Sequence, residues 1–119
     1  MNYNLNFIYF AILAIISTGC SNSSNQYADS SHEKLVGQSV YEKYCIACHQ
    51  KDGKGLGGTL AGDFVNDKSI LAKSNDILFD AVWNGKKGKT SVMPAHKGML
   101  QPSQVSNAIN YIRKIYGNK

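Results

Sequence analysis

The chain has 119 residues, with 13 Lys and Arg against 8 Asp and Glu, a formal net charge of +5 and 43% hydrophobic residues. This length leaves room for one small domain. The basic balance favours acidic partners, but the lysines are not interleaved with aromatic residues in a nucleic-acid-binding motif, so nucleic acid is not an expected partner.

The N-terminal segment contains a nearly continuous apolar run, LNFIYFAILAII, at residues 5–16. The run is shorter than the roughly 20 residues that a membrane span needs, but it suits the core of a secretory signal. STGC follows, ending at Cys20, and then a polar Ser/Asn-rich tract. These features resemble a bacterial lipoprotein signal. The resemblance implies a signal peptide at residues 1–19, a lipidated Cys20 and a flexible polar tether at residues 20–32. A conventional signal cleaved nearby and an uncleaved anchor are the alternatives.

The domain proper is expected at residues 33–119, and its first element is a helix over residues 33–45. Val36, Val40 and Tyr44 recur there at helical spacing. Residues 50–69 are rich in Gly, Asp, Asn and Lys and show no period, so they are predicted to form a long loop. Such a loop is unusual in a small domain unless it wraps around something.

Two more helices follow. Residues 74–85 predict a short helix that is capped by Ser74 or Asn75 and ended by Gly85, and residues 86–100 predict a second loop. Residues 101–117 predict an amphipathic helix with Pro102 in its first turn. The expected apolar faces are Ile77, Leu78, Ala81 and Val82 on the short helix, and Val105, Ala108, Ile109, Ile112 and Ile115 on the last. No segment alternates with a period of two, so the expected fold is all-α, with about three to four helices and long loops.

The sequence CIACH, Cys45 to His49, is the motif that carries chemistry. Two cysteines at this spacing serve as a redox dithiol, as half of a zinc site, or as the attachment point of haem. A redox dithiol begins a helix after a strand, and no strand is predicted here. A zinc site needs a second close pair of ligands, whereas His32 and His96 are far apart. A histidine directly after the second cysteine favours covalent haem attachment.

Other residues lie at sequence spacings from this motif that are typical of a known family. Gly37 and Tyr41 precede Cys45 by eight and four residues, MPA occupies residues 93–95, and Tyr-Ile-Arg occupies residues 111–113. Together with CIACH they resemble the class I cytochrome c family, in its small single-haem bacterial form, from residue 33 to the C-terminus.

The resemblance implies a small cytochrome c fold that wraps around one covalent haem c. Cys45 and Cys48 would form the two thioether bonds, and His49 would be the proximal iron ligand. The resemblance also implies that Gly37 lets the first and last helices approach closely, and that Tyr41 packs at their crossing against Ile109 or Ile112.

The loop after the motif has two expected roles. By the same resemblance, the Gly58 carbonyl orients His49, and Leu60 covers the haem. Gly53, Gly55 and Gly58 also form a G-x-G-x-x-G pattern. A nucleotide fingerprint must follow a strand and open a helix, and neither condition holds, so no nucleotide is expected.

Three residues are candidates for the sixth iron ligand. Met93 precedes a proline in a Gly/Lys-rich loop and matches the family's Met-Pro position, so it is the expected ligand. Thioether ligation opposite histidine raises the potential, as suits electron carriers. Met99 is expected in the core. His96 is expected at the surface, although it could form a two-histidine site of lower potential.

Lysines flank both ligand segments: Lys51 and Lys54 follow CIACH, and Lys86, Lys87, Lys89 and Lys97 surround Met93. A basic ring around an exposed haem edge would steer acidic redox partners. The sequence therefore predicts a lipid-anchored or soluble periplasmic electron carrier between respiratory-chain proteins, and not an enzyme. The alternative is the electron-accepting haem subunit of a periplasmic dehydrogenase or reductase. A gas sensor or peroxidase would need an open sixth site, against which Met93 argues.

Overall fold

The computed structural model describes residues 23–57 and 61–118. In chain order the described elements are α1 (Ser23–Val40), the π-helical turn η2 (Tyr41–Cys45), α2 (Ile46–His49), α3 (Lys68–Leu71), α4 (Asn75–Trp83), β1 (Lys86–Lys87), β2 (Val92–Met93) and α5 (Pro102–Tyr116). The only sheet among these residues is the two-residue ribbon of β1 and β2. The predicted all-α fold is confirmed.

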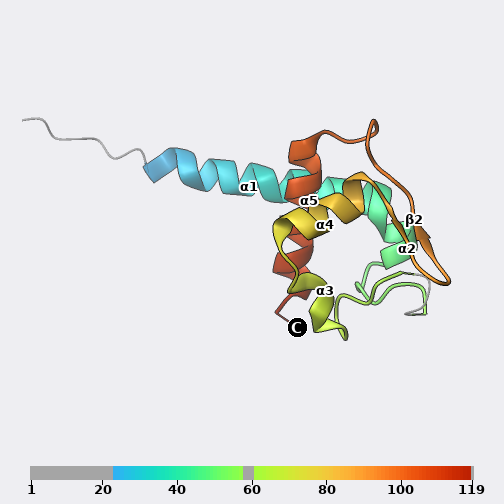
Figure 1. Ribbon diagram of the computed structural model, residues 1–119. Coiled ribbons are helices and arrows are strands. Elements are labelled where there is room, and N and C mark those ends of the chain that lie inside the picture. Colours follow the sequence, from blue (N-terminus) through green and yellow to red (C-terminus); the bar gives the residue numbers. More distant parts are fainter. Residues whose placement is uncertain (1–22, 58–60, 119) are drawn as a thin grey trace, which may run out of the picture.

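α1 crosses α5 at Gly37 (Figure 1). A Cβ atom at Gly37 would lie 2.2 Å from the backbone oxygen of Asn107 and 2.9 Å from the Cβ of Tyr111. The two backbones can therefore meet only because this position has no side chain, as the family resemblance implies. Tyr41, one turn on, is 1% exposed and packs in one cluster with Ile112.

The core consists of two clusters that share α5. Val105, Ala108 and Ile109 pack with Val40 and Leu100, and the inner face of α4 covers them. Ile112 and Tyr116 pack with Tyr41 and with Phe64 from the loop after the motif. The predicted stripe of α5 is thus confirmed at its first four positions. Ile115 is partly buried, and Tyr116 is buried beside it. The first cluster joins the helices, and the second joins α5 to the motif.

α1 begins ten residues before the predicted start of the first helix. The stretch predicted as a flexible tether is therefore helical from Ser23, whereas Cys20 and the signal peptide lie outside the described residues. No Gly or Pro interrupts residues 23–36. The helix can therefore extend outward from its packed end, because each further residue that adopts the helical conformation adds one backbone hydrogen bond. Its residues 29–35 are exposed, and this end of α1 projects from the domain (Figure 1).

None of the helices in the described residues combines the length and the apolar character that crossing a bilayer requires.

The α4 helix keeps its predicted bounds but turns a different face to the core. Ser74 caps it, its Oγ accepting from the Ile77 N–H at 3.4 Å. Leu78 and Val82 pack inward as predicted, but Phe79 and Trp83 accompany them, while Ile77 is 56% exposed. The two aromatic rings stack 5.6 Å apart. Their larger apolar area outweighs that of Ile77 and Ala81.

Two short elements were not predicted: α3, which begins at the end of the predicted loop of residues 50–69, and the ribbon within the predicted loop of residues 86–100. α3 is a single turn capped by Asp67, whose Oδ1 accepts from the Ser69 N–H at 3.0 Å. β1 and β2 pair antiparallel, with Lys86 opposite Met93 and Lys87 opposite Val92. Strands of two residues cannot show a period-two pattern, so sequence periodicity could not reveal the ribbon.

Candidate haem-binding site

The CIACH motif forms one continuous helical path through η2 and α2. Cys45 ends the π-turn, and Cys48 and His49 follow on the next turn. Both cysteines are free thiols, Cys45 half-buried and Cys48 exposed. Residues three apart lie on the same face of a helix, so both thiols are presented together.

Burial, and to a lesser extent the neighbouring Cys48, raises the pKa of the Cys45 thiol to about 11. The Cys45 Sγ contacts the Val40 carbonyl oxygen at 4.0 Å. A catalytic dithiol instead needs a cysteine whose pKa is lowered, because the thiolate is the nucleophile. The redox-dithiol interpretation of CIACH therefore fits this environment poorly.

His49 is held in one orientation by its Nδ1 atom, which lies 3.3 Å from the Gly62 carbonyl oxygen. A carbonyl can only accept, so Nδ1 carries the proton and Nε2 is left as the metal-binding nitrogen. Burial lowers the pKa of His49, as does nearby His96, while the bond to Gly62 opposes this change. The neutral imidazole that results is the form that binds iron.

Among the described residues, the carbonyl that orients His49 belongs to Gly62. Gly58, whose carbonyl was predicted for this role, lies outside the described residues together with Leu60. The apolar partner of His49 is Phe64, whose ring stacks on the imidazole with centroids 4.6 Å apart and planes inclined at 15°. A glycine-rich loop without periodicity does not reveal which of its carbonyls returns to the histidine.

The loop folds back onto the motif through backbone hydrogen bonds. The N–H of Gly55 donates to the His49 carbonyl at 3.1 Å, and that of Leu56 to the Cys48 carbonyl at 3.1 Å. These bonds satisfy carbonyls that a helix end leaves free. Gly55 has φ +71°, and a Cβ there would lie 2.5 Å from the Ala61 oxygen. The predicted wrapping loop is thus tied to the motif itself.

Two tyrosines hold the start of this loop from the other side. The Tyr41 hydroxyl donates to the Gln50 carbonyl at 2.7 Å, and the Tyr116 hydroxyl donates to the Lys51 carbonyl at 2.9 Å. Gly53 lies against the Tyr116 ring, where a Cβ would come within 2.7 Å. Sequence reasoning did not assign Tyr116 to the site, although it lies four residues after Ile112 on the buried stripe of α5.

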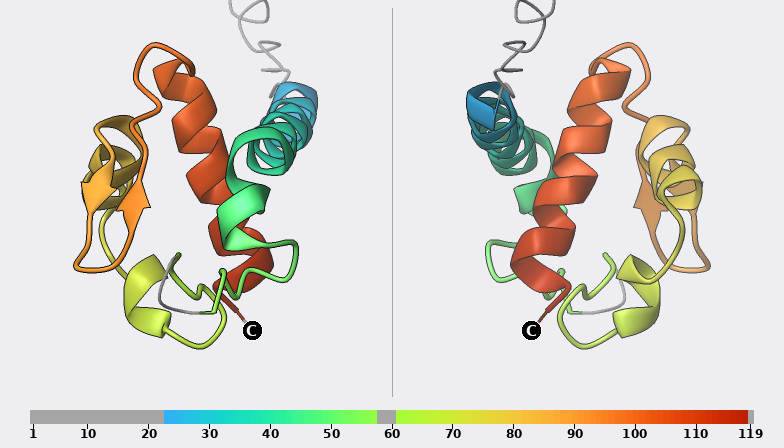
Figure 2. Two further views of the ribbon diagram at one scale, coloured as in Figure 1. Left: turned by 90° about the vertical axis from the view of Figure 1, so that its right-hand side faces the viewer. Right: turned by 90° about the vertical axis from the view of Figure 1, so that its left-hand side faces the viewer.

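Met93, the expected sixth ligand, is half-buried on β2. Figure 2 shows the ribbon and α2 facing each other from opposite sides of the domain. The other two candidates differ from their predictions. Met99 is 56% exposed rather than part of the core, and His96 is 5% exposed rather than at the surface. Its ring meets Tyr44 edge-on at 6.4 Å.

The donor set fits a c-type haem. Two unbridged thiols share a helical face, a neutral histidine is fixed through Nδ1 beside them, and a thioether stands on a facing element. Among the described residues, no cluster of three or more His, Cys, Asp or Glu could hold a metal ion.

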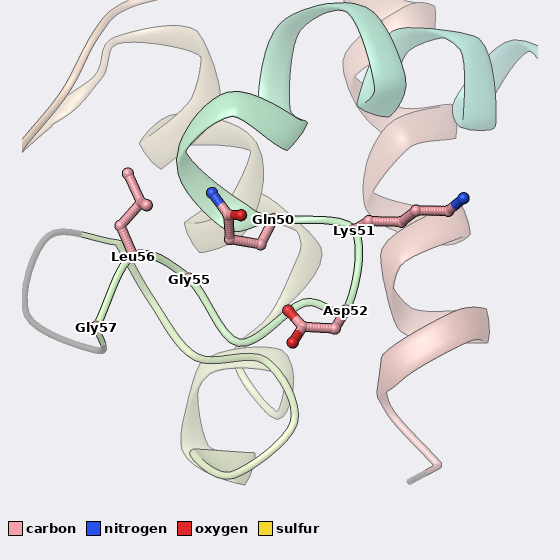
Figure 3. Close-up of a pocket in the computed structure, with 6 residues that line it drawn as sticks. All are labelled: Gln50, Lys51, Asp52, Gly55, Leu56 and Gly57. Atoms are coloured by element: carbon pink, nitrogen blue, oxygen red, sulfur yellow. The ribbon is translucent and has the colours of Figure 1, made fainter.

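A surface hollow lies in the loop after the motif (Figure 3). Its lining consists of Gln50, Lys51, Asp52, Gly55, Leu56 and Gly57. Figure 3 shows Lys51 and Leu56 pointing in different directions. None of the predicted haem ligands lines this hollow, so it is a feature of the loop surface and not the haem site.

Basic side chains are exposed near both ligand segments. Lys86, Lys87, Lys89 and Lys97 are exposed around Met93, and no Asp or Glu occurs between Gly85 and Met99. Lys51 and Lys54 are exposed in the loop after the motif. There Lys54 contributes to lowering the pKa of Asp63, although hydrogen bonds from Asn66 contribute most. The lysines around Met93 therefore have fewer acidic neighbours to balance their positive charge than the lysines after the motif.

Comparison with known proteins places this arrangement in a family. The family model described as "Cytochrome C oxidase, cbb3-type, subunit III" matches residues 33–112. The Cbb3-type cytochrome c oxidase subunit FixP of Bradyrhizobium diazoefficiens is 31% identical over 89 residues, covering 74% of this chain and 29% of the relative.

Subunits of two dehydrogenases are also similar. The cytochrome c subunit of the quinone alcohol dehydrogenase of Gluconacetobacter polyoxogenes is 26% identical over 108 residues, covering 82% of this chain and 22% of the relative. The gluconate 2-dehydrogenase cytochrome c subunit of Pantoea cypripedii is 29% identical over 93 residues, covering 72% of this chain and 21% of the relative. The chain thus spans less than a third of the length of each of these curated relatives.

Proposed function

We propose residue roles and a function on the premise that this chain belongs to the c-type cytochrome family described as "Cytochrome C oxidase, cbb3-type, subunit III". Membership of that family means that the chain carries covalent haem c and transfers electrons. In this proposal Cys45 and Cys48 form the thioether bonds, and His49 and Met93 are the axial ligands. The protein transfers one electron at a time between redox proteins and binds no substrate.

The observation that carries the proposal is the environment of His49. Its Nδ1–H is committed to the Gly62 carbonyl and its ring face to Phe64, which leaves Nε2 as the coordinating atom. Haem supplies the one-electron Fe(III)/Fe(II) couple when bound. The residues of this chain fix the histidine tautomer, keep its ring from rotating and cover one of its faces with the Phe64 ring, so the ligand geometry can stay unchanged between oxidation states.

The assignment of Met93 rests on how the three candidates are placed. Met99 is mostly exposed. The bond of the His96 Nδ1 to the Val82 carbonyl leaves Nε2 free, as it does in His49, so the preference for Met93 over His96 rests on the family's Met-Pro position, which Met93 occupies. Met93 is half-buried on the ribbon that faces α2. A thioether opposite histidine favours ferrous iron and raises the potential, which supports a carrier rather than a gas sensor or peroxidase.

Covalent attachment tests the proposal directly. In a host with haem-attachment machinery, the unmutated protein should keep haem on the chain after denaturation, as seen by haem staining of a denaturing gel. The variant Cys45→Ser with Cys48→Ser should lose the stain. If acidic organic solvent extracts the haem of the unmutated protein, the proposed attachment is wrong.

The kind of partner is proposed from the exposed lysines around Met93. An acidic docking surface on the partner would be attracted to them, with association that weakens as salt rises.

The named relatives are subunits of oxidoreductases, which supports the second candidate, a haem subunit of such a complex. Stable co-purification with a dehydrogenase or oxidase would favour the subunit, whereas salt-sensitive electron exchange without a stable complex would favour the free carrier.

Anchorage on the periplasmic side of a bacterial membrane is proposed from the lipoprotein-like segment that ends at Cys20. Cys20→Ser should release the protein from membranes or block its processing, as measured by membrane fractionation. Mass spectrometry of the mature chain provides the second measurement. An unmodified chain that starts at another residue would exclude lipidation but leave export intact.

A further inference from the structure

The segment that follows Met93 ends on the C-terminus of α4. The N–H of His96 donates to the Val82 carbonyl at 3.1 Å, and the N–H of Lys97 donates to the Trp83 carbonyl at 3.1 Å. Val82 and Trp83 are the last residues of α4, and the last four carbonyls of a helix have no partner within it. The loop that carries the proposed ligand therefore caps this helix.

His96 adds a side-chain bond to the same anchor. Its Nδ1 lies 3.3 Å from the Val82 carbonyl oxygen, which already accepts from the His96 backbone. Since a carbonyl can only accept, Nδ1 is the protonated nitrogen. The residue is 5% exposed, and its ring meets Tyr44, on the turn that leads into CIACH, edge-on at 6.4 Å. One side chain thus links α4, the ribbon loop and the motif helix.

The ribbon offers Met93 little rigidity of its own. β1 and β2 have two residues each, Val92 is 67% exposed, and an isolated two-stranded hairpin is at best marginally stable in water. Gly85 lies against the other side of the segment, where a Cβ would come within 2.7 Å of the Met93 oxygen and 2.8 Å of the Ala95 nitrogen. The position of Met93 therefore depends on the hydrogen bonds that tie its loop to the C-terminus of α4.

We propose that His96 is a positioning residue that fixes Met93 by tying its loop to the Val82 carbonyl. The inference rests on the proposed function, because it takes Met93 as the sixth iron ligand. The bond is made by this chain alone and does not depend on His96 binding iron. When it is removed, the Met93 thioether should dissociate from iron more often, so an added ligand should enter faster.

Two variants at this position separate the hydrogen bond from the volume of the ring. His96→Phe keeps an aromatic ring against Tyr44 but has no donor, whereas His96→Asn places an amide N–H near the position of Nδ1. The readouts are the rate at which imidazole binds the ferric protein and the sulfur-to-iron charge-transfer band. His96→Phe should bind imidazole about tenfold faster, which corresponds to the loss of one hydrogen bond to a backbone carbonyl. His96→Asn should restore most of the wild-type rate.

A third variant tests the same segment from its other side. Gly85 has φ +75°, so Gly85→Ala adds backbone strain and a clash with the Met93 oxygen. It should also speed imidazole binding. Ser39→Ala, at an exposed position on α1, is the matched control and should leave the rate unchanged. Haem staining and far-ultraviolet circular dichroism report whether each variant has folded with its haem.

The outcomes distinguish this inference from the proposed function. A wild-type protein without the charge-transfer band would show that Met93 is not the ligand, and both would fail. A wild-type protein with the band, whose His96→Phe variant binds imidazole at the wild-type rate, would overturn only the positioning role. If His96→Asn is as fast as His96→Phe, the hydrogen bond is not the anchor, which also overturns the inference.

Discussion

The ring of Phe64 lies flat against the imidazole of His49, with centroids 4.6 Å apart. Phe64 reaches this position because Asp63, just before it, folds the chain into a turn by accepting the backbone N–H groups of Val65 and Asn66, both at 2.9 Å. The N–H of Phe64 also donates to the Gly53 carbonyl at 2.8 Å. The loop thereby supplies both the carbonyl and the apolar surface that fix the proximal histidine.

Replacement of Phe64 should cost stability in proportion to the volume removed. Phe64 is 7% exposed, so Phe64→Ala should lower the free energy of unfolding by about 3–5 kcal/mol. Phe64→Leu, which keeps more of the volume, should cost about 1.5 kcal/mol or less. Denaturant unfolding of the holoprotein measures both. Equal losses for the two variants would show that filling this space is not what matters.

Gly37→Ala should destabilise the helix crossing. Alanine is the better helix former by about 1 kcal/mol, but its Cβ would lie 2.2 Å from the Asn107 oxygen. Separating the backbones should cost about 1–3 kcal/mol beyond that gain, lowering the midpoint of thermal unfolding. Ser39→Ala, at an exposed site on the same helix, is the control. A Gly37→Ala protein more stable than wild type would contradict the packing described.

Met93→Ala and Met99→Ala should behave in opposite ways. Loss of the Met93 thioether should abolish the charge-transfer band and lower the reduction potential, on the order of a hundred millivolts, because axial ligands set haem potentials. Met99 is 56% exposed, so its truncation should change stability by only about 0.5 kcal/mol and leave the potential unaltered. Spectroscopic redox titration measures both. A band lost in Met99→Ala and kept in Met93→Ala would reverse the assignment.

Tyr41 should make the protein sensitive to alkali. Burial first, and then neighbouring Tyr116, raises the pKa of Tyr41 well above its ordinary value of 10.0. The unfolded chain therefore loses this proton at a lower pH than the folded protein does. The contribution of Tyr41 to stability is complete below about pH 10 and decreases as pH rises above that value.

Tyr41→Phe separates this effect from other alkaline changes. The variant should be less stable by about 1 kcal/mol at neutral pH, because the Gln50 carbonyl loses its donor at 2.7 Å. Above pH 10 its stability should fall less steeply than that of wild type. Denaturant unfolding between pH 7 and about pH 11, followed by circular dichroism, gives both quantities. Parallel pH curves for the two proteins would rule out Tyr41 as the titrating group.

The sequence by itself determined the features that repeat at short range. The spacing of apolar residues predicts α5 and its buried stripe, Ser74 and Gly85 predict the limits of α4, and CIACH predicts the attachment chemistry. Gly37 could be assigned to the helix crossing only through the family resemblance, and the structure confirms it. Local patterns suffice for these helices and for the motif because apolar spacing, capping and haem attachment each depend on residues only a few positions apart in the sequence.

The tertiary structure decided which distant groups meet. No pattern in the glycine-rich loop distinguishes the Gly62 carbonyl from that of Gly58, and no local signal brings Phe64 to His49. The exposure of Met99 and the burial of His96 were likewise predicted wrongly. Whether a loop side chain is buried depends on which helix end its backbone caps. That partner, the C-terminus of α4, is fixed only when the chain has folded.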